Sequence, residues 1–327
     1  TTPSPRFGFM QVAGNERKTS GSYYTPASLV DCLLDSALNP VVDERIRNHK
    51  ALGYPSAEAA ILSLKVCDPA CGSGHFLIAA AQRIARRLAL VRAGDDEPAP
   101  DQLRHALRQV IGHCIYAVDV NPMSVELCRV ALWLEGVEPG KPLSFLDHHI
   151  RVGNSLLGTT PELIAAGLPD NAFTAIEGDD KKACAVLKKR NKAERKGLGP
   201  LFAKQDAEAQ AHLQKAVAAI EELPDDRPED IRAKELAFRR HEQTEEYRHK
   251  KQLADAWCAA FVIRKHFREP GREASASGIT QGHITGLAEG RALPTDLAGE
   301  VERLSGQYQL FHWHLAFPEV FVLRATR

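Results

Sequence analysis

Two aspartates and two glycines occupy positions from which they could bind a small molecule. Asp68 ends a short apolar stretch and opens a turn that contains Gly72 and Gly74. Glycine lacks a Cβ atom, so this turn can bend tightly and let the backbone approach a ligand. Asp119 ends a second apolar stretch, where an acid in a nucleotide-binding fold holds ribose hydroxyls. Either acid alone could be a solvated loop residue, but the two together favour a nucleoside site.

The chemistry of this turn indicates which nucleoside it binds. Residues 68–74 have the sequence DPACGSG, which differs from the GxGxxG pattern of a pyrophosphate-binding turn. An acid beside the ligand suits a cation or an amine. S-adenosylmethionine carries an ammonium, a sulfonium and a ribose but no phosphate, so we expect it to be the cofactor.

Alternating strands and helices must position these residues. Apolar stretches predict strands at 61–67 and 113–120, and 149–158 predicts a third strand with its exit loop. Helical patterns cover 73–92, 102–109 and 121–134. This order predicts an α/β fold with a parallel sheet, whose strands all end at the edge where such sheets bind ligands. A further helix should begin at Thr25, with Pro26 in its first turn.

The second half of the chain has a different character. Residues 181–196 hold eight basic residues and one acid, and 205–222 and 228–267 have helical patterns. Residues 268–294 predict a loop, and 295–307 a short helix. We therefore expect a polar, flexible arm (1–22), an α/β core (23–160), a mostly helical insert (161–310) and a final segment (311–327).

Composition narrows the class of protein. The formal net charge is zero, so a nucleic-acid surface would have to be local. The sequence has neither an apolar run of membrane-spanning length nor a signal peptide, which indicates a cytoplasmic protein. Its seven cysteines lack paired spacing, which predicts reduced thiols and no zinc site.

Five segments resemble the N-6 adenine-specific DNA methyltransferases of the gamma motif order. They are SYYTPASLV (22–30), DPACGSGHFL (68–77), VDVNPMSVELCRVALWLE (118–135), SFLDHHIRVGNSLLG (144–158) and FHWHLAFPEVF (311–321). The sequences of these segments are most similar to methylases of type IIG restriction-modification enzymes and of BREX- or DISARM-like phage defence. The resemblance implies the Rossmann-like class I S-adenosylmethionine-dependent methyltransferase fold, here incomplete and with a large helical insert.

The resemblance also implies a role for individual residues at the methionine end of the cofactor. Thr25 would bind the carboxylate, with Tyr24 and Pro26 shaping the wall beside it. Asp68 would face the ammonium.

The rest of the cofactor would lie against the turn and the next two strand ends. Ala70, Gly72 and Gly74 would line it by backbone. Asp119 would take the ribose hydroxyls, and Pro122 would pack near the adenine. Asn154 stands where the family often has an aspartate that accepts a hydrogen bond from the adenine amino group, which an amide oxygen can also accept.

The catalytic motif of the family, (D/N)PP(Y/F), is not found in the sequence. Asn121-Pro122 is followed by Met123, and Asn39-Pro40 by Val41. In the family, that motif activates a flipped adenine of double-stranded DNA. We therefore expect the chain to bind cofactor without methylating DNA. It would be the first part of a larger enzyme, or a chain whose partner supplies the catalytic half, or a naturally truncated protein. Alternatives are a methyltransferase acting on RNA or protein, or a non-enzymatic subunit that binds cofactor or DNA.

Other features allow two interpretations each. The basic run 181–196 could contact DNA phosphates or be a solvated helical face. The aromatic residues of 311–321 fit a packed segment better than a base-stacking surface. His148-His149 and His312-His314 suggest a metal only weakly, because neither pair has a nearby set of acid and histidine ligands in the sequence. Cys71 is expected to be a small spacer in the turn.

Overall fold

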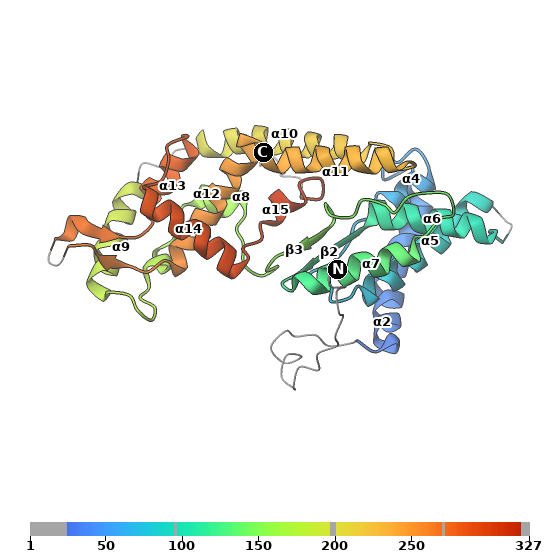
Figure 1. The fold of residues 1–327 in the computed structure, drawn as a ribbon, viewed down its shortest axis with the longest axis horizontal. Helices are drawn as coiled ribbons and strands as arrows, with labels where there is room; N and C mark the ends of the chain where they lie inside the picture. Colours follow the sequence, from blue (N-terminus) through green and yellow to red (C-terminus); the bar gives the residue numbers. More distant parts are fainter. Residues whose placement is uncertain (1–24, 95–96, 197–200, 270–271, 322–327) are drawn as a thin grey trace, which may run out of the picture.

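The computed structural model describes residues 25–94, 97–196, 201–269 and 272–321. The expected arm at 1–22, Tyr24 and the end of the final segment lie outside these residues. The elements form two lobes (Figure 1): an α/β lobe at the right and a helical lobe at the left. Two helices, α10 (Leu201–Glu221) and α11 (Pro228–Gln243), run along both.

The α/β lobe is built on a three-stranded parallel sheet of order β1-β2-β3. The strands are β1 (Val66–Asp68), β2 (Ile115–Asp119) and β3 (Ile150–Val152). Asp68 pairs with Ala117 in register, and Asp119 pairs with Val152. The predicted parallel sheet is therefore confirmed, and its strands end at one edge.

Helices of the α/β lobe cover one face of the sheet and continue beyond its edge. They are α2 (Ala27–Leu33), α3 (Asn39–Asn48), α4 (Ala57–Leu62), α5 (His75–Ala93), α6 (Pro100–Cys114) and α7 (Pro122–Glu135), with a π-helical turn at Leu34–Leu38. Alternate residues of β2 point to opposite faces. Ile115 and Ala117 join the core beneath these helices, whereas Tyr116 and Val118 pack against Phe311 and Phe317 on the other face.

The helical lobe has its own apolar core, to which α12 contributes most. Its helices are α8 (Pro161–Ala166), α9 (Lys181–Arg195), α10 (Leu201–Glu221), α11 (Pro228–Gln243), α12 (Glu245–Val262), α13 (Gln281–Ala288), α14 (Thr295–Tyr308) and α15 (Trp313–Ala316). Short 3-10 turns cover Asp170–Phe173 and Glu273–Ser275, and β4 (His266–Phe267) pairs with β5 (Ala276–Ser277). No helix of the described residues is long and apolar enough to cross a membrane.

Three local predictions were wrong. Residues 61–67 do not form one strand, because Ile61 and Leu62 finish α4, whose start is capped by the Ser56 hydroxyl. Thr25 does not begin a helix, since α2 starts at Ala27. The stretch 268–294 is not only loop but includes α13 and β5.

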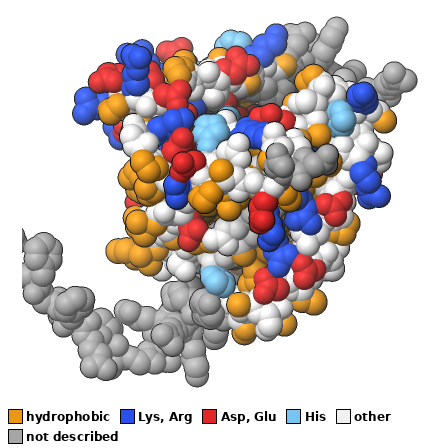
Figure 2. All heavy atoms as spheres, turned by 90° about the vertical axis from the view of Figure 1, so that its right-hand side faces the viewer, with side chains coloured by type: hydrophobic (Ala, Val, Ile, Leu, Met, Phe, Trp, Pro, Cys, Tyr) orange, Lys and Arg blue, Asp and Glu red, His pale blue; other side chains and the backbone are white. Residues whose placement is uncertain are grey.

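The outer face of α7 carries an apolar stripe. Its other side is buried through Val125 and Leu132. The exposed residues recur every three or four positions and are Met123 (66% exposed), Leu127 (51%), Val130 (45%) and Leu134 (71%). Figure 2 shows that hydrophobic side chains gather on one side of the α/β lobe. A contiguous exposed apolar surface is typical of a site that another polypeptide covers.

Candidate functional site

The turn after β1 depends on two glycines with left-handed backbones. Gly72 has φ +54° and Gly74 has φ +84°. At Gly74 space is also lacking, because a Cβ atom would lie 2.7 Å from Cys128 Sγ. The amide of Cys71 donates to Val118 O (3.1 Å) and fixes the turn to β2. Only glycine satisfies both demands at position 74, which explains the second glycine of the motif.

Asp119 joins the end of β2 to this turn. Its Oδ2 accepts a hydrogen bond from Gly72 N (2.9 Å), and its Oδ1 accepts one from Asn121 N (2.8 Å). Each carboxylate oxygen can accept a second bond, so Asp119 is held in place and still able to take a hydroxyl donor.

Asp68 lies beside the turn with an elevated pKa. Burial raises the pKa of its carboxyl, the N–H of Ala70 (3.0 Å) partly offsets this, and the nearby charge of Asp119 raises it further. Two carboxylates at one edge favour a ligand that brings positive charge, because a cation relieves the repulsion between them.

A cavity of about 340 Å³ opens at this edge of the sheet. Six of the predicted site residues line it: Thr25, Asp68, Ala70, Gly72, Asp119 and Asn154. Pro26, Gly74 and Pro122 are not among its lining residues. Gly74 instead faces Cys128, while Pro122 forms the first turn of α7. Tyr24 lies outside the described residues.

The cavity also has walls that the sequence prediction did not include. They are Pro69, Cys71, Ser73, His75, Phe76, Val120, Ser124, Gly153, Ser155 and Leu156. Several of them are neighbours of predicted residues in the sequence, and this adjacency could have predicted that they line the cavity. Cys71 is a buried free thiol whose pKa is raised by its hydrogen bond with Cys128 and by burial, which agrees with a spacer role.

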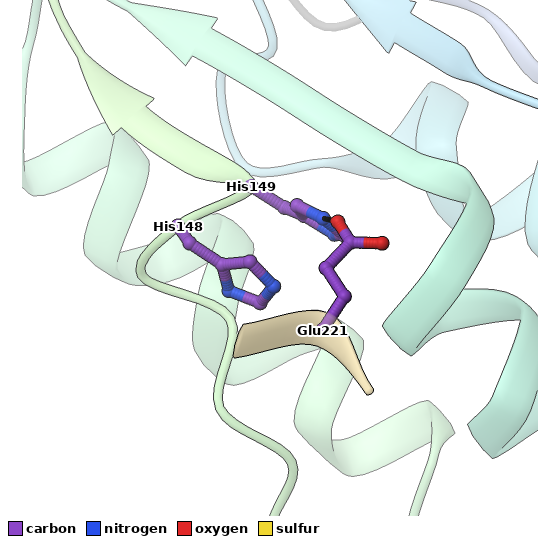
Figure 3. A group of neighbouring side chains, drawn as sticks. All are labelled: His148, His149 and Glu221. Carbon is purple, nitrogen blue, oxygen red and sulfur yellow. Dashed lines mark hydrogen bonds and ion pairs between the residues drawn. The ribbon is translucent and has the colours of Figure 1, made fainter. Parts of the chain in front are cut away.

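A second polar cluster lies at the opposite end of the strands (Figure 3). His149 is fully buried, and its Nε2 lies 2.7 Å from Glu221 Oε1 at the end of α10. One ligand-type atom from each of His148, His149 and Glu221 lies within 4.8 Å of the others. No motif in the sequence indicated Glu221, which is 72 residues from His149.

Lys65 already supplies a positive charge to this cluster. Its Nζ lies 3.8 Å from Glu221 Oε2 and donates to the hydroxyl of Tyr116 (3.0 Å). A divalent cation would have to displace this ammonium or be repelled by it. That neither histidine pair holds a metal stays a prediction.

Glu319 adds a partly buried acid to the same region. Burial raises the pKa of its carboxyl, and the charge of Glu221 raises it as well, to about 7. An acid whose pKa is raised by folding destabilises the folded state at pH values above its pKa in the unfolded chain, because the unfolded chain ionises more readily. We expect Glu319→Gln to stabilise the protein by about 2 kcal/mol at pH 8 and by much less at pH 4.5. Urea unfolding at both pH values checks this; an equal gain at both would contradict it.

The remaining features of the sequence have definite places. Phe311 and Phe317 are buried against β2, which confirms the packed interpretation of this segment. The basic run forms α9, where Asp170 lies within 3.0–3.9 Å of Lys188, Lys192 and Arg195.

Comparison with known proteins gives one family. Residues 7–176, just over half of the chain, match the family N-6 DNA Methylase. The chain is 32% identical over 160 residues to the adenine-specific methyltransferase PglX of Streptomyces coelicolor, which covers 46% of this chain and 11% of that protein. It is 25% identical over 231 residues to a putative type II restriction enzyme and methyltransferase of Methanocaldococcus jannaschii, which covers 57% and 19%.

The matched part is thus less than a fifth of the length of either relative. No solved structure matches the chain significantly.

Proposed function

Since this chain belongs to the N-6 DNA methylase family, we propose that it is the S-adenosylmethionine-binding part of a DNA adenine N-6 methyltransferase of restriction-modification or phage defence. The family has an S-adenosylmethionine-dependent methyltransferase fold, with which the parallel sheet and its helices agree. The observation that carries the proposal is the cavity at the strand ends, where Asp68 and Asp119 flank a glycine turn.

The cavity suggests an orientation for the cofactor. Thr25 and Asp68 would hold the carboxylate and ammonium of the methionine end, with Ala70 and Gly72 presenting backbone to its middle. Asp119 would bind the ribose, and Asn154 would face the adenine. Pro26, Gly74 and Pro122 would support these walls from behind.

The chain would leave the chemical step to residues it does not contain. It has no (D/N)PP(Y/F) sequence, so it offers no group of that kind to activate an adenine amino group. We propose that the catalytic half and target recognition lie in another part of the enzyme or in a second chain, and that residues 161–310 are an insert. The exposed stripe on α7 supports a further polypeptide contact.

Calorimetry and a transfer assay test this function together. The isolated chain should bind S-adenosylmethionine and S-adenosylhomocysteine, yet transfer no methyl group to adenine-rich duplex DNA. Absence of nucleoside binding would refute the cofactor site. Appreciable methyl transfer would refute the proposed division of labour.

Cofactor binding should depend on pH through Asp68. Protonation removes the charge that attracts the ligand ammonium, and the pKa of Asp68 is raised. We therefore expect the affinity for S-adenosylhomocysteine to fall as the pH is lowered from 7.5 to 5. Methylthioadenosine has no ammonium, so its affinity should stay constant and show that the cavity remains intact.

The variant Asp68→Asn should remove this pH dependence and lower the affinity for S-adenosylhomocysteine about tenfold, as expected for the loss of one charged hydrogen bond. The matched control is Asp101→Asn, whose side chain is 87% exposed on α6. A pH profile unchanged by Asp68→Asn would assign the effect to another group.

A further inference from the structure

One wall of the cavity is held by a segment that follows the helical lobe in the sequence and packs against β2 and the loop after β3. This clamp segment, residues 309–313, follows α14 and lies beside the loop that leaves β3. The amide of Asn154 donates to Gln309 O (2.8 Å), and the amide of Phe311 donates to Leu157 O (2.8 Å). Trp313 Nε1 donates to Ser155 O (3.0 Å). Two residues of the cavity wall, Asn154 and Ser155, are therefore fixed by the clamp segment.

The loop is shaped to accept this segment at close range. A Cβ atom on Gly153 would lie 2.4 Å from the ring of Phe311, and one on Gly158 would lie 2.0 Å from the carbonyl oxygen of Phe311. Gln309 has φ +49°, which is unusual for a residue with a side chain. Its left-handed backbone ends α14 and directs its carbonyl oxygen to the amide of Asn154.

A chain of buried hydrogen bonds connects the loop to α12. His312 Nδ1 accepts from Thr159 N (3.2 Å), so its Nε2 carries the proton and donates to Asp255 Oδ1 (2.9 Å). Asp255 also accepts from Lys251 Nζ (2.6 Å). His312 and Asp255 are only 4% and 6% exposed, so water competes little for these bonds.

The opposite wall has a different support. Asp68 and Asp119 are held by backbone amides of Ala70, Gly72 and Asn121, all within the α/β lobe. The two ends of the cavity are thus positioned by different lobes.

We infer that Phe311, His312 and Asp255 are positioning residues through which the helical lobe sets the selectivity of the cavity for the base of the nucleoside. This rests on the proposed nucleoside site. The clamp segment fixes the backbone that presents Asn154, so its loss releases the base end, whereas the acids that hold the ribose and the ammonium stay in place.

The test compares two ligands that differ only in the base. Calorimetry measures the dissociation constants of S-adenosylhomocysteine and of S-inosylhomocysteine, in which an oxo group replaces the amino group. We expect the wild type to prefer the adenine compound about tenfold, as one selective hydrogen bond would give. In His312→Ala this ratio of dissociation constants should fall to about one.

Rescue separates positioning from simple stability. Asp255→Asn keeps an oxygen that accepts from His312, so it should retain most of the selectivity that Asp255→Ala loses. The control His212→Ala lies on α10, where its exposed side chain pairs with Glu246, and should leave the ratio unchanged. If His312→Ala fails to fold, the two Asp255 variants decide the question.

The outcomes are distinguishable. A wild type that binds neither nucleoside would refute the proposed function and this inference together. A wild type that discriminates, with a folded His312→Ala or Asp255→Ala of unchanged selectivity, would overturn this inference and leave the cofactor site standing.

Discussion

Replacing Asp119 by alanine is expected to weaken the binding of S-adenosylhomocysteine about 100-fold. The ribose would lose two hydrogen bonds to a carboxylate, and at about 1.5 kcal/mol each, the low end for bonds to a charged group, they account for this factor. The variant would also lose the bond to Gly72 N (2.9 Å), which holds the glycine turn against β2. Calorimetry measures the loss directly.

The variant Asp119→Asn refines this prediction. One side of the amide is an N–H₂ group, which cannot accept from either Gly72 N or Asn121 N, the two donors that now face the carboxylate. We expect asparagine to weaken binding as well, by about tenfold.

A matched control and an unfolding curve make the result interpretable. Asp101→Ala removes an acid that is 87% exposed on α6 and should not change affinity. If folded Asp119→Ala binds the nucleoside within threefold of the wild type, the ribose role of this residue is excluded.

The second large effect is expected at Glu221, in the buried cluster at the other end of the strands. Glu221 lies close to His149 Nε2 (2.7 Å) and to Lys65 Nζ (3.8 Å). At pH 7.5 the ring of His149 is neutral, so removing Glu221 leaves the N–H of this fully buried ring without an acceptor, which costs about 1–3 kcal/mol. We expect Glu221→Ala to lower the free energy of unfolding by about 2 kcal/mol at pH 7.5, because water can solvate the partly exposed Lys65 and only the His149 ring is left without a partner.

The pH dependence gives this prediction a second readout. Burial acts to raise the pKa of Glu221, but the hydrogen bond from His149 and the charge of Lys65 lower it to about 2. An acid whose pKa is lowered by folding stabilises the folded state at pH values above its pKa in the unfolded chain, which is 4.5 for Glu221. This contribution is lost as the pH falls toward 2. The difference between wild type and Glu221→Ala should therefore be full at pH 7.5 and shrink below pH 4.5.

Burial of His149 adds an acid sensitivity of its own. Its pKa is lowered to about 4, because burial disfavours the charged ring more than Glu221 favours it. The unfolded chain then binds this proton first, so the wild type should lose stability as the pH falls from about 6.5 to 4.

Urea unfolding at several pH values tests both statements. The neighbouring Glu222→Gln serves as control, because Glu222 is exposed. Equal unfolding midpoints for wild type and Glu221→Ala at pH 7.5 would show that the cluster contributes no net stability.

The sequence by itself determined the features that depend on local chemistry. A strand that ends in Asp68, a turn with two glycines and a helix after it are neighbours along the chain, so their motif could be recognised without a fold. Asp119 was predictable because it ends the next predicted strand, and parallel strands bring their carboxyl ends to one edge. Six of the predicted site residues consequently line the cavity.

Only the tertiary structure decided which distant residues support that site. Asp119 bonds Gly72 across 47 positions, His149 meets Glu221 across 72, and Thr159 meets His312 across 153. No periodicity or motif encodes such pairs, because they arise from how whole helices pack. The short apolar run 61–67 was ambiguous for a related reason: without the Ser56 cap and the packing of α4, it fits a strand and a buried helix end equally well.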